Sequence, residues 1–124
     1  MPSRERVREF IARVEDGQYV TAIEDFYHPE ASMQENGAPP RVGRDLLVEH
    51  ERKVLAGLMS MRTRAVEIFL VDGNQVVINW VFEMTGPDGV MRTMDELALQ
   101  TWDGDRIATE RFYYDPAQLR PARA

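Results

Sequence analysis

The sequence predicts an α+β fold, in which three N-terminal helices pack on a strongly curved, mostly antiparallel sheet to form a cone-shaped roll. Two observations lead to this fold class. Three amphipathic segments with helical spacing occupy the first 58 residues, and four strand-length segments follow at hairpin spacing, over residues 60–71, 74–85, 91–102 and 105–114. A long meander that follows helices can wrap around them, so we expect a cavity where the two layers do not meet.

Each helical segment has a recognisable end and one apolar face. Ser3 is an N-cap for the first helix, expected over residues 4–16, and Pro29 closes the second, expected over residues 20–27. The third helix is expected over residues 44–58. The side chains predicted to face the core are Val7, Phe10, Ile11 and Val14 in the first helix, Val20, Ile23, Phe26 and Tyr27 in the second, and Leu47, His50, Val54 and Leu58 in the third.

The strands are recognised by alternation and by the turns between them. Residues 31–36 predict a short strand, and a loop rich in glycine and proline follows over residues 37–43. Asp-Gly pairs mark the later turns. Residues 76–84 alternate with a period of two, which separates an inner from an outer face. The inner, concave face is expected to carry Val76, Ile78, Trp80, Phe82 and Met84.

Length and composition indicate one domain, which we place at residues 1–115, with a flexible tail over residues 116–124. A chain of 124 residues that is 44% apolar can form a single core. Its 21 acidic and 15 basic residues give a formal charge of −6, which argues against nucleic-acid binding. Cysteine is absent, and no apolar run reaches the roughly 20 residues that span a bilayer, so we expect a cytoplasmic protein that does not enter membranes.

The outer face of the strand over residues 74–85 is more apolar than contact with water alone would favour. Val77 and Val81 lie there between polar residues. A sheet face of this kind often pairs with a second copy of itself, so we expect a homodimer through the outer sheet face.

Four stretches of the sequence resemble a known family. They are Phe-Tyr-His-Pro-Glu-Ala-Ser-Met-Gln-Glu at residues 26–35, Gly43-Arg44 before the third helix, Trp-Val-Phe-Glu-Met-Thr-Gly at residues 80–86, and residues 102–115 at the end of the sheet. Together they resemble the nuclear transport factor 2-like superfamily, in its SnoaL-like and ketosteroid-isomerase-like branch. The resemblance covers nearly the whole chain and implies a cone with a pocket between helices and sheet. It implies no single activity, because the superfamily includes isomerases, cyclases, epoxide hydrolases, dehydratases and transport adaptors.

The resemblance also implies positions for the isomerase's functional residues. Its general base, an aspartate on the first short strand, corresponds to Glu35. Its two oxyanion donors, a tyrosine on the first helix and an acid on the penultimate strand, correspond to Ile11 and Ala98, and neither side chain can donate a hydrogen bond. Shifting the last hairpin by one residue replaces Ala98 with Leu97 or Leu99, which supplies no acid. The match therefore argues against ketosteroid isomerisation by the familiar mechanism.

Glu35 and His50 are the candidate catalytic residues. If Glu35 shares the inner face with Met33, burial would raise its affinity for a proton toward the neutral range. The alternative is a solvated carboxylate at the end of its strand. His50 interrupts an apolar helical stripe, so it is either a core histidine or an acid–base partner of Glu35. His28 fits best as part of the end of the second helix, and we expect no metal site and no cofactor.

The predicted pocket has aromatic walls and a few polar groups. It is expected to be lined by Met33, Trp80, Phe82, Met84, Gln100, Trp102, Glu110, Phe112 and Tyr114. Such a mixture suits a small, partly apolar ligand with a carbonyl or hydroxyl group. The alternative for Glu110 is an ordinary ion pair across strands with Arg92 or Arg106.

Two classes of function follow from these residues. The first is a cofactor-independent enzyme of isomerase, cyclase or dehydratase type, with Glu35 as base and His50 as its partner. The second is a non-catalytic ligand-binding or dimeric accessory module, which the missing oxyanion donors favour. The sequence does not decide between them.

Overall fold

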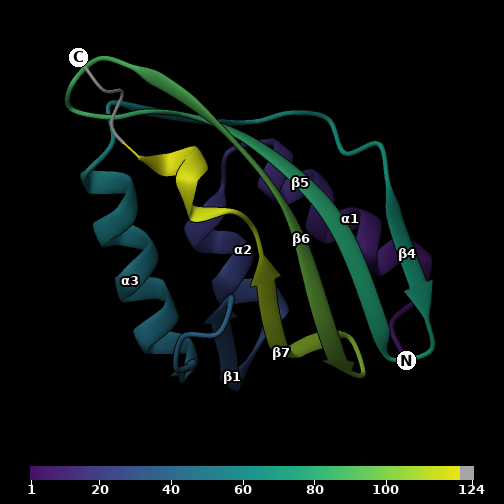
Figure 1. Ribbon diagram of the computed structural model, residues 1–124. Coiled ribbons are helices and arrows are strands. Elements are labelled where there is room, and N and C mark those ends of the chain that lie inside the picture. The colour runs from purple at the N-terminus through teal and green to yellow at the C-terminus, as the bar shows by residue number, and fades with distance from the viewer. Residues whose placement is uncertain (121–124) are drawn as a thin grey trace.

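Three helices lie on the concave side of one curved sheet (Figure 1). The structure is a computed structural model and describes residues 1–120. The helices are α1 (Arg4–Glu15), α2 (Tyr19–Phe26) and α3 (Arg44–Ala56), and a short 3-10 helix, η1 (Pro116–Leu119), follows the sheet. The strands are β1 (Tyr27–Glu35), β2 (Arg41–Val42), β3 (Ser60–Thr63), β4 (Phe69–Asp72), β5 (Gln75–Thr85), β6 (Met91–Asp103) and β7 (Arg106–Tyr113). None of the described helices is long and apolar enough to cross a membrane.

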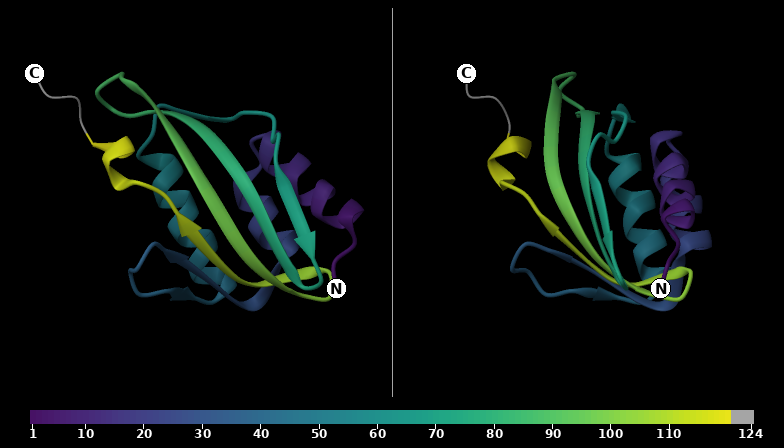
Figure 2. Two further views of the ribbon diagram at one scale, coloured as in Figure 1. Left: turned by 45° about the vertical axis from the view of Figure 1, so that its right-hand side comes forward. Right: turned by 90° about the vertical axis from the view of Figure 1, so that its right-hand side faces the viewer.

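The sheet is mixed and mostly antiparallel, as predicted. Its order is β2-β1-β7-β6-β5-β3, with β4 also paired to β5. Only β1 and β7 run parallel, which places Met33 beside Glu110 and Glu35 beside Phe112. The two further views in Figure 2 show the sheet as one bent layer with all three α-helices on the same side.

The first helix is the clearest local prediction, and it is confirmed. Ser3 Oγ accepts a hydrogen bond from the Arg6 backbone N–H at 3.0 Å, which satisfies one of the free donors at the helix start. The predicted face, Val7, Phe10, Ile11 and Val14, is buried. The Phe10 ring meets the rings of Trp80 and Trp102 edge-on, with centroids 6.0 and 6.2 Å apart. These contacts join α1 to the narrow end of the cone.

The alternation of β5 is also confirmed. Val76, Ile78, Trp80 and Phe82 are buried toward the helices. On β6 the inner side chains are buried, whereas Leu97 and Leu99 on the outer face are 48% and 39% exposed. One face of these strands therefore builds the core and the other remains at the surface.

The first expected long strand, residues 60–71, is wrong as a single element. It divides into β3 and β4, which both pair with β5. Thr63 pairs with Phe82 and Phe69 with Ile78, so residues 64–68 lie opposite only residues 79–81 of β5. This segment of the chain has more residues than β5 has partner positions, so some of them do not pair with β5. Glu15 Oε2 accepts a hydrogen bond from the Val66 N–H at 2.7 Å, which satisfies a donor that the sheet does not pair.

The loop expected over residues 37–43 contains a strand that the sequence analysis missed. β2 pairs with β1 there, and Arg41 lies beside Met33. β1 also begins earlier than expected, at Tyr27, directly after α2. Both differences arise because edge pairing depends on a partner strand rather than on local sequence.

The predicted inner stripe of α3 is confirmed in part, because Leu47 is buried and both His50 and Val54 line the cavity. Leu47 and Val48 are buried, but Val54 is 37% exposed, and the helix ends at Ala56, before the expected Leu58. Glu51 faces the interior in place of a further apolar residue. This is possible because the end of α3 borders an open cavity rather than packed side chains.

The expected loose tail over residues 116–124 is wrong for its first part. Pro116–Leu119 form η1, capped by the Asp115 side chain, which accepts from the Ala117 N–H at 2.9 Å. The Gln118 amide donates to the Asp95 carbonyl at 3.1 Å and accepts from the Asp95 N–H at 2.9 Å. The Gln118 side chain thus pairs with the backbone of β6 at Asp95, beyond the point where β7 ends. Residues 121–124 lie outside the described part of the chain.

Candidate functional site

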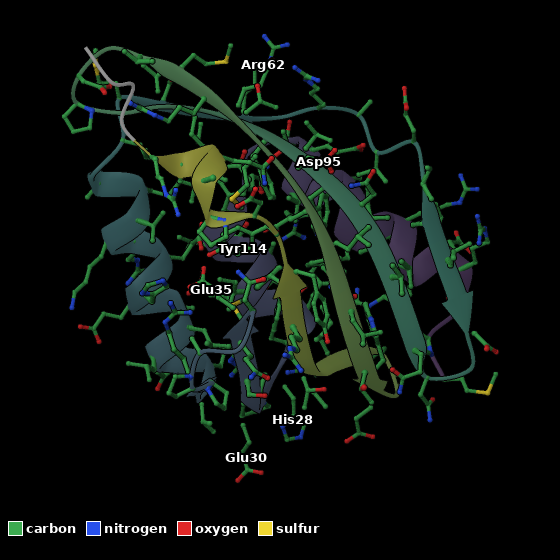
Figure 3. All side chains as sticks on the ribbon, viewed as in Figure 1. His28, Glu30, Glu35, Arg62, Asp95 and Tyr114 are labelled. Carbon is green, nitrogen blue, oxygen red and sulfur yellow. The ribbon has the colours of Figure 1, made fainter. Side chains whose placement is uncertain are left out.

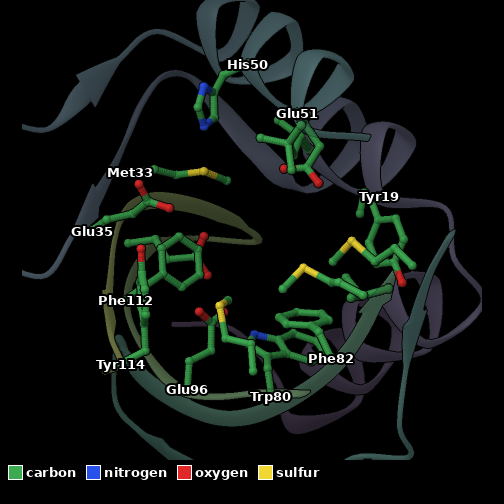
Figure 4. A pocket seen from close by; sticks show the side chains of 18 of the residues that line it. Tyr19, Met33, Glu35, His50, Glu51, Trp80, Phe82, Glu96, Phe112 and Tyr114 are labelled. Carbon is green, nitrogen blue, oxygen red and sulfur yellow. The ribbon is translucent and has the colours of Figure 1, made fainter. Parts of the chain in front are cut away.

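A cavity of about 420 Å³ lies between the helices and the sheet at the wide end of the cone (Figure 4). Among the residues that line it are seven of the expected wall residues: Met33, Trp80, Phe82, Met84, Glu110, Phe112 and Tyr114. Glu35 and His50 line it too. The structure therefore brings both candidate catalytic residues to one connected space.

Gln100 and Trp102 are expected in the wall but lie behind it. Both are buried, and neither lines the cavity. Trp102 Nε1 donates to Gln100 Oε1 at 2.9 Å, and Gln100 Nε2 donates to Glu110 Oε2 at 2.6 Å. They face inward as the alternation predicts, but they lie toward the narrow end, where α1 fills the space in front of them. Their role is to hold Glu110.

Glu110 is a buried acid at the floor of the cavity, with both carboxyl oxygens occupied. The Tyr27 hydroxyl donates to Oε1 and Gln100 to Oε2. Burial raises the pKa of Glu110 to about 7, although these two hydrogen bonds act in the opposite direction. The expected alternative, an ion pair with Arg92 or Arg106, is wrong, because Glu110 is only 3% exposed and its partners are neutral.

Glu96 is a functional candidate that sequence analysis missed. It lies on β6 beside Trp80, lines the cavity and is only 4% exposed. Within residues 1–120, no side chain or backbone group forms a hydrogen bond with its carboxyl, and the carboxyl oxygens are accessible from the cavity. Burial, followed by the nearby charge of Glu110, raises the pKa of Glu96 to about 9. At neutral pH it is therefore an uncharged acid, able to donate a hydrogen bond into the cavity.

Glu96 changes the comparison with the two oxyanion donors of the isomerase. Ile11 and Ala98 are both buried in the core, as their residue types require. Glu96, however, lies two residues before Ala98 on the same face of the same strand. The one-residue shift considered in the sequence analysis supplies no acid, but the residue two positions away does. The alternation of β6 was the signal that could have found Glu96.

Glu35 lies at the rim of the cavity. Its exposure is intermediate between the two expected alternatives, a buried base and a solvated carboxylate. Its side chain is 38% exposed, and its Oε2 accepts from Arg41 Nη2 at 2.7 Å. Tyr114 lies nearby on the same wall, and burial together with the charges of Glu35 and Glu96 raises the pKa of the Tyr114 phenol. The missed strand β2 places Arg41 here, so sequence analysis could not foresee this ion pair.

His50 and Glu51 approach the cavity from α3. Burial and the positive charge of Arg41 lower the pKa of His50, which favours the neutral imidazole. Burial and the charge of Glu35 raise the pKa of Glu51. No hydrogen bond joins His50 to Glu35 among the described residues, although both border the mouth (Figure 4).

His28 lies away from the site, at the other end of β1 from Glu35 (Figure 3). Its Nδ1 accepts a hydrogen bond from the Glu30 N–H at 3.1 Å, which is a local turn contact. Within residues 1–120, no three His, Asp or Glu side chains are arranged to hold a metal ion.

The cavity thus combines a neutral acid on the sheet wall with the Glu35 carboxyl, paired to Arg41, and a neutral histidine at the mouth. With this geometry established, comparison with known proteins identifies the family. The model of the SnoaL-like domain matches residues 7–110. This chain belongs to the SnoaL-like domain family. No curated protein sequence matches it.

Solved structures of SnoaL-like and related proteins share the fold. A protein described as a SnoaL-like polyketide cyclase from Mesorhizobium loti is 24% identical, with a TM-score of 0.78 over 92% of this chain and 100% of its own. An NTF2-like protein of unknown function from Burkholderia pseudomallei is 16% identical, with a TM-score of 0.80 over 93% and 92% of the two chains. A protein from Catenulispora acidiphila with a ketosteroid isomerase-like fold, in complex with trimethylamine, is 15% identical, with a TM-score of 0.77 over 91% and 87%. At these identities the similarity establishes the fold.

Proposed function

We propose that this SnoaL-like protein binds a small, partly apolar carbonyl compound and acts on it by acid–base chemistry of isomerase, cyclase or dehydratase type. The observation that carries the proposal is the carboxyl of Glu96, which is buried, unpartnered and directed into an apolar cavity. Its oxygens contact the open space of the cavity, so a ligand that accepts a hydrogen bond there can take the place of water at this carboxyl. A carbonyl oxygen is the simplest acceptor that fits.

The proposed reaction begins with proton transfer at the carbon next to the carbonyl. Glu35 removes the proton, the C–H electron pair forms a C=C bond, and the carbonyl oxygen becomes an enolate oxygen. Glu96 stabilises that oxygen by donating its proton in a hydrogen bond. The carboxylic acid formed at Glu35 then returns the proton to another carbon or to a leaving hydroxyl, with His50 available as its partner.

The positions of the two acids suit this division of roles. Glu35 is on β1 and Glu96 on β6, and β7 lies between them. Two strand spacings separate their backbones by roughly 10 Å, which leaves room for a small ligand between the carboxyls. Arg41 Nη2 contacts only Oε2 of Glu35, at 2.7 Å, and so fixes the position of this carboxyl at the cavity rim.

A second candidate function is non-catalytic binding in the same cavity. The ion pair of Glu35 with Arg41 favours it, because a carboxylate held by a guanidinium is a weaker base. The two functions differ in whether proton transfer occurs on the bound ligand.

Deuterium uptake distinguishes these functions. Cyclic enones incubated with the protein in D₂O should exchange the protons next to the carbonyl faster than in buffer, as followed by NMR. Glu35→Gln should abolish the acceleration, and Glu96→Leu should reduce it by about 10²- to 10³-fold, as for loss of one oxyanion donor. Glu49→Gln on the exposed face of α3 is the control. Enone binding without accelerated exchange would leave only the binding function.

We also propose that the outer sheet face pairs with a second copy of the chain. Leu70, Leu97, Leu99 and Tyr113 are 62%, 48%, 39% and 42% exposed on β4, β6 and β7. An apolar face of this kind is unfavourable in water and complementary to itself across a two-fold axis. Light scattering should give the mass of a dimer, and Leu97→Asp combined with Leu99→Asp should give a monomer.

A further inference from the structure

The cavity contains more acids than cations. Six acidic or basic side chains line it: Glu35, Arg41, His50, Glu51, Glu96 and Glu110. Arg41 pairs with Glu35 at 2.7 Å, and burial favours the neutral form of His50. The other three acids have no cationic side chain as a partner.

These three acids surround the same space. Glu96 lies on the sheet wall and Glu51 on the opposite, helical wall (Figure 4), and Glu110 lines the same cavity from β7. Glu110 receives hydrogen bonds from Tyr27 and Gln100, but Glu96 is more than nine-tenths buried and has no partner in residues 1–120. Three carboxyls this close repel one another when ionised, so each favours its protonated form.

The remaining walls offer aromatic faces. The rings of Trp80 and Phe82 are stacked, with centroids 5.8 Å apart, and Tyr19 meets Phe82 edge-on at 6.4 Å. All three residues line the cavity. The face of an aromatic ring carries partial negative charge and attracts cations, most strongly for tryptophan and in sites shielded from water.

From this arrangement we propose that the ligand of the cavity carries a positively charged or protonatable nitrogen, which the carboxyls of Glu51, Glu96 and Glu110 surround beside the Trp80 ring. The inference rests on the proposed function, since it names the substrate class of the same cavity. An amine with a carbonyl a few bonds away can place its oxygen at one carboxyl and its nitrogen near another. An anionic ligand would add a like charge and be rejected.

Three probes of similar shape test this inference on the full chain. They are benzyltrimethylammonium, its uncharged carbon analogue neopentylbenzene, and the anion phenylacetate, with binding followed by NMR at pH 8. The cation should bind about tenfold or more tightly than the uncharged probe, and the anion at least about tenfold more weakly. Affinity for the cation should rise from pH 6 to pH 9, because protons on the acids compete with it.

Substitutions of the acids test whether these carboxyls, rather than the aromatic rings, cause the preference for the cation. Glu51→Gln and Glu96→Gln should each reduce affinity for the cation about fivefold or more, while affinity for neopentylbenzene changes less than about twofold. Glu49→Gln is the matched control, because Glu49 is on the same helix, 62% exposed and paired with Lys53. It should change neither affinity.

Two outcomes would overturn the inference in different ways. If neopentylbenzene binds as tightly as the cation, or if affinity for the cation is independent of pH, the charge preference is wrong but the cavity remains a ligand site. If none of the three probes binds, the charge preference and the ligand site of the proposed function fail together. Enone exchange tests the proposed chemistry separately.

Discussion

The two ends of β5 are built on the same face of the same strand and have opposite surroundings. At the narrow end, Ile78 is fully buried beneath α1, where the rings of Phe10 and Trp102 pack together. At the wide end, Met84 is only partly buried and borders the cavity with Glu96 and Tyr114. At the narrow end helices and sheet pack directly together, and at the wide end both line the cavity.

This difference shows how one pattern of alternation can serve both stability and function. The inner face is apolar at the narrow end because packing there excludes water and polar groups. At the wide end no helix fills the space, so acids can occupy inner positions without displacing packed atoms. The cavity is the space that the helical layer and the curved sheet leave between them.

The largest expected effect is on stability, and it should differ between substitutions at the two ends of β5. Ile78→Ala should lower the free energy of unfolding by about 2–5 kcal/mol, because it leaves an enclosed hole in the packed end. Met84→Ala should cost less than about 1.5 kcal/mol, because its side chain already borders open space. Urea unfolding followed by tryptophan fluorescence measures both. Equal losses would mean that the wide end is packed as tightly as the narrow end.

The second prediction concerns the pH dependence of stability at the wide end. The pKa of Glu96 is about 9 in the folded protein, against 4.5 for an unperturbed glutamate, so the folded state binds its proton more tightly. Its contribution is fully present below pH 4.5 and is lost as the pH rises through 9. Relative to Glu96→Gln, the unmodified protein should lose on the order of 3 kcal/mol between pH 5 and pH 9. Parallel pH profiles would show that Glu96 is ionised at neutral pH.

The smallest expected effect concerns η1, at the edge of the wide end. Gln118→Ala removes the two hydrogen bonds to Asp95 at an exposed site, so it should cost about 1 kcal/mol or less. Amide exchange at Asp95 should nevertheless become faster, as measured by NMR, while exchange at the buried strand positions stays the same. Unchanged exchange at Asp95 would mean that Gln118 does not hold the edge of β6.

Much of the fold could be predicted because the sequence patterns that indicate it are local. The N-cap at Ser3 and the inner face of α1 depend on residues within one helix. The alternation along β5 likewise places Trp80 and Phe82 on the inner face from spacing alone. The presence of Glu35 near a pocket came from the family resemblance.

The features that were missed all depend on contacts between distant segments. The break between β3 and β4 arises because residues 64–68 exceed the partner positions on β5. The width of the α3 face that meets the cavity depends on the distance between helix and sheet, and this face includes Glu51 as well as the predicted His50 and Val54. Arg41 reaches Glu35 only through β2, a two-residue strand with no local signature.

The sequence by itself determined the fold class, the family and the inner faces of α1 and β5, because capping, periodicity and apolar spacing act over a few residues. Only the tertiary structure decided which inner residues are packed and which are left facing empty space. Glu96 and Gln100 lie on the same face of β6, and their spacing predicts the same environment. Glu96 lines the cavity, whereas Gln100 lies behind it and supports Glu110. The distance between helices and sheet decides this difference, and no local pattern encodes it.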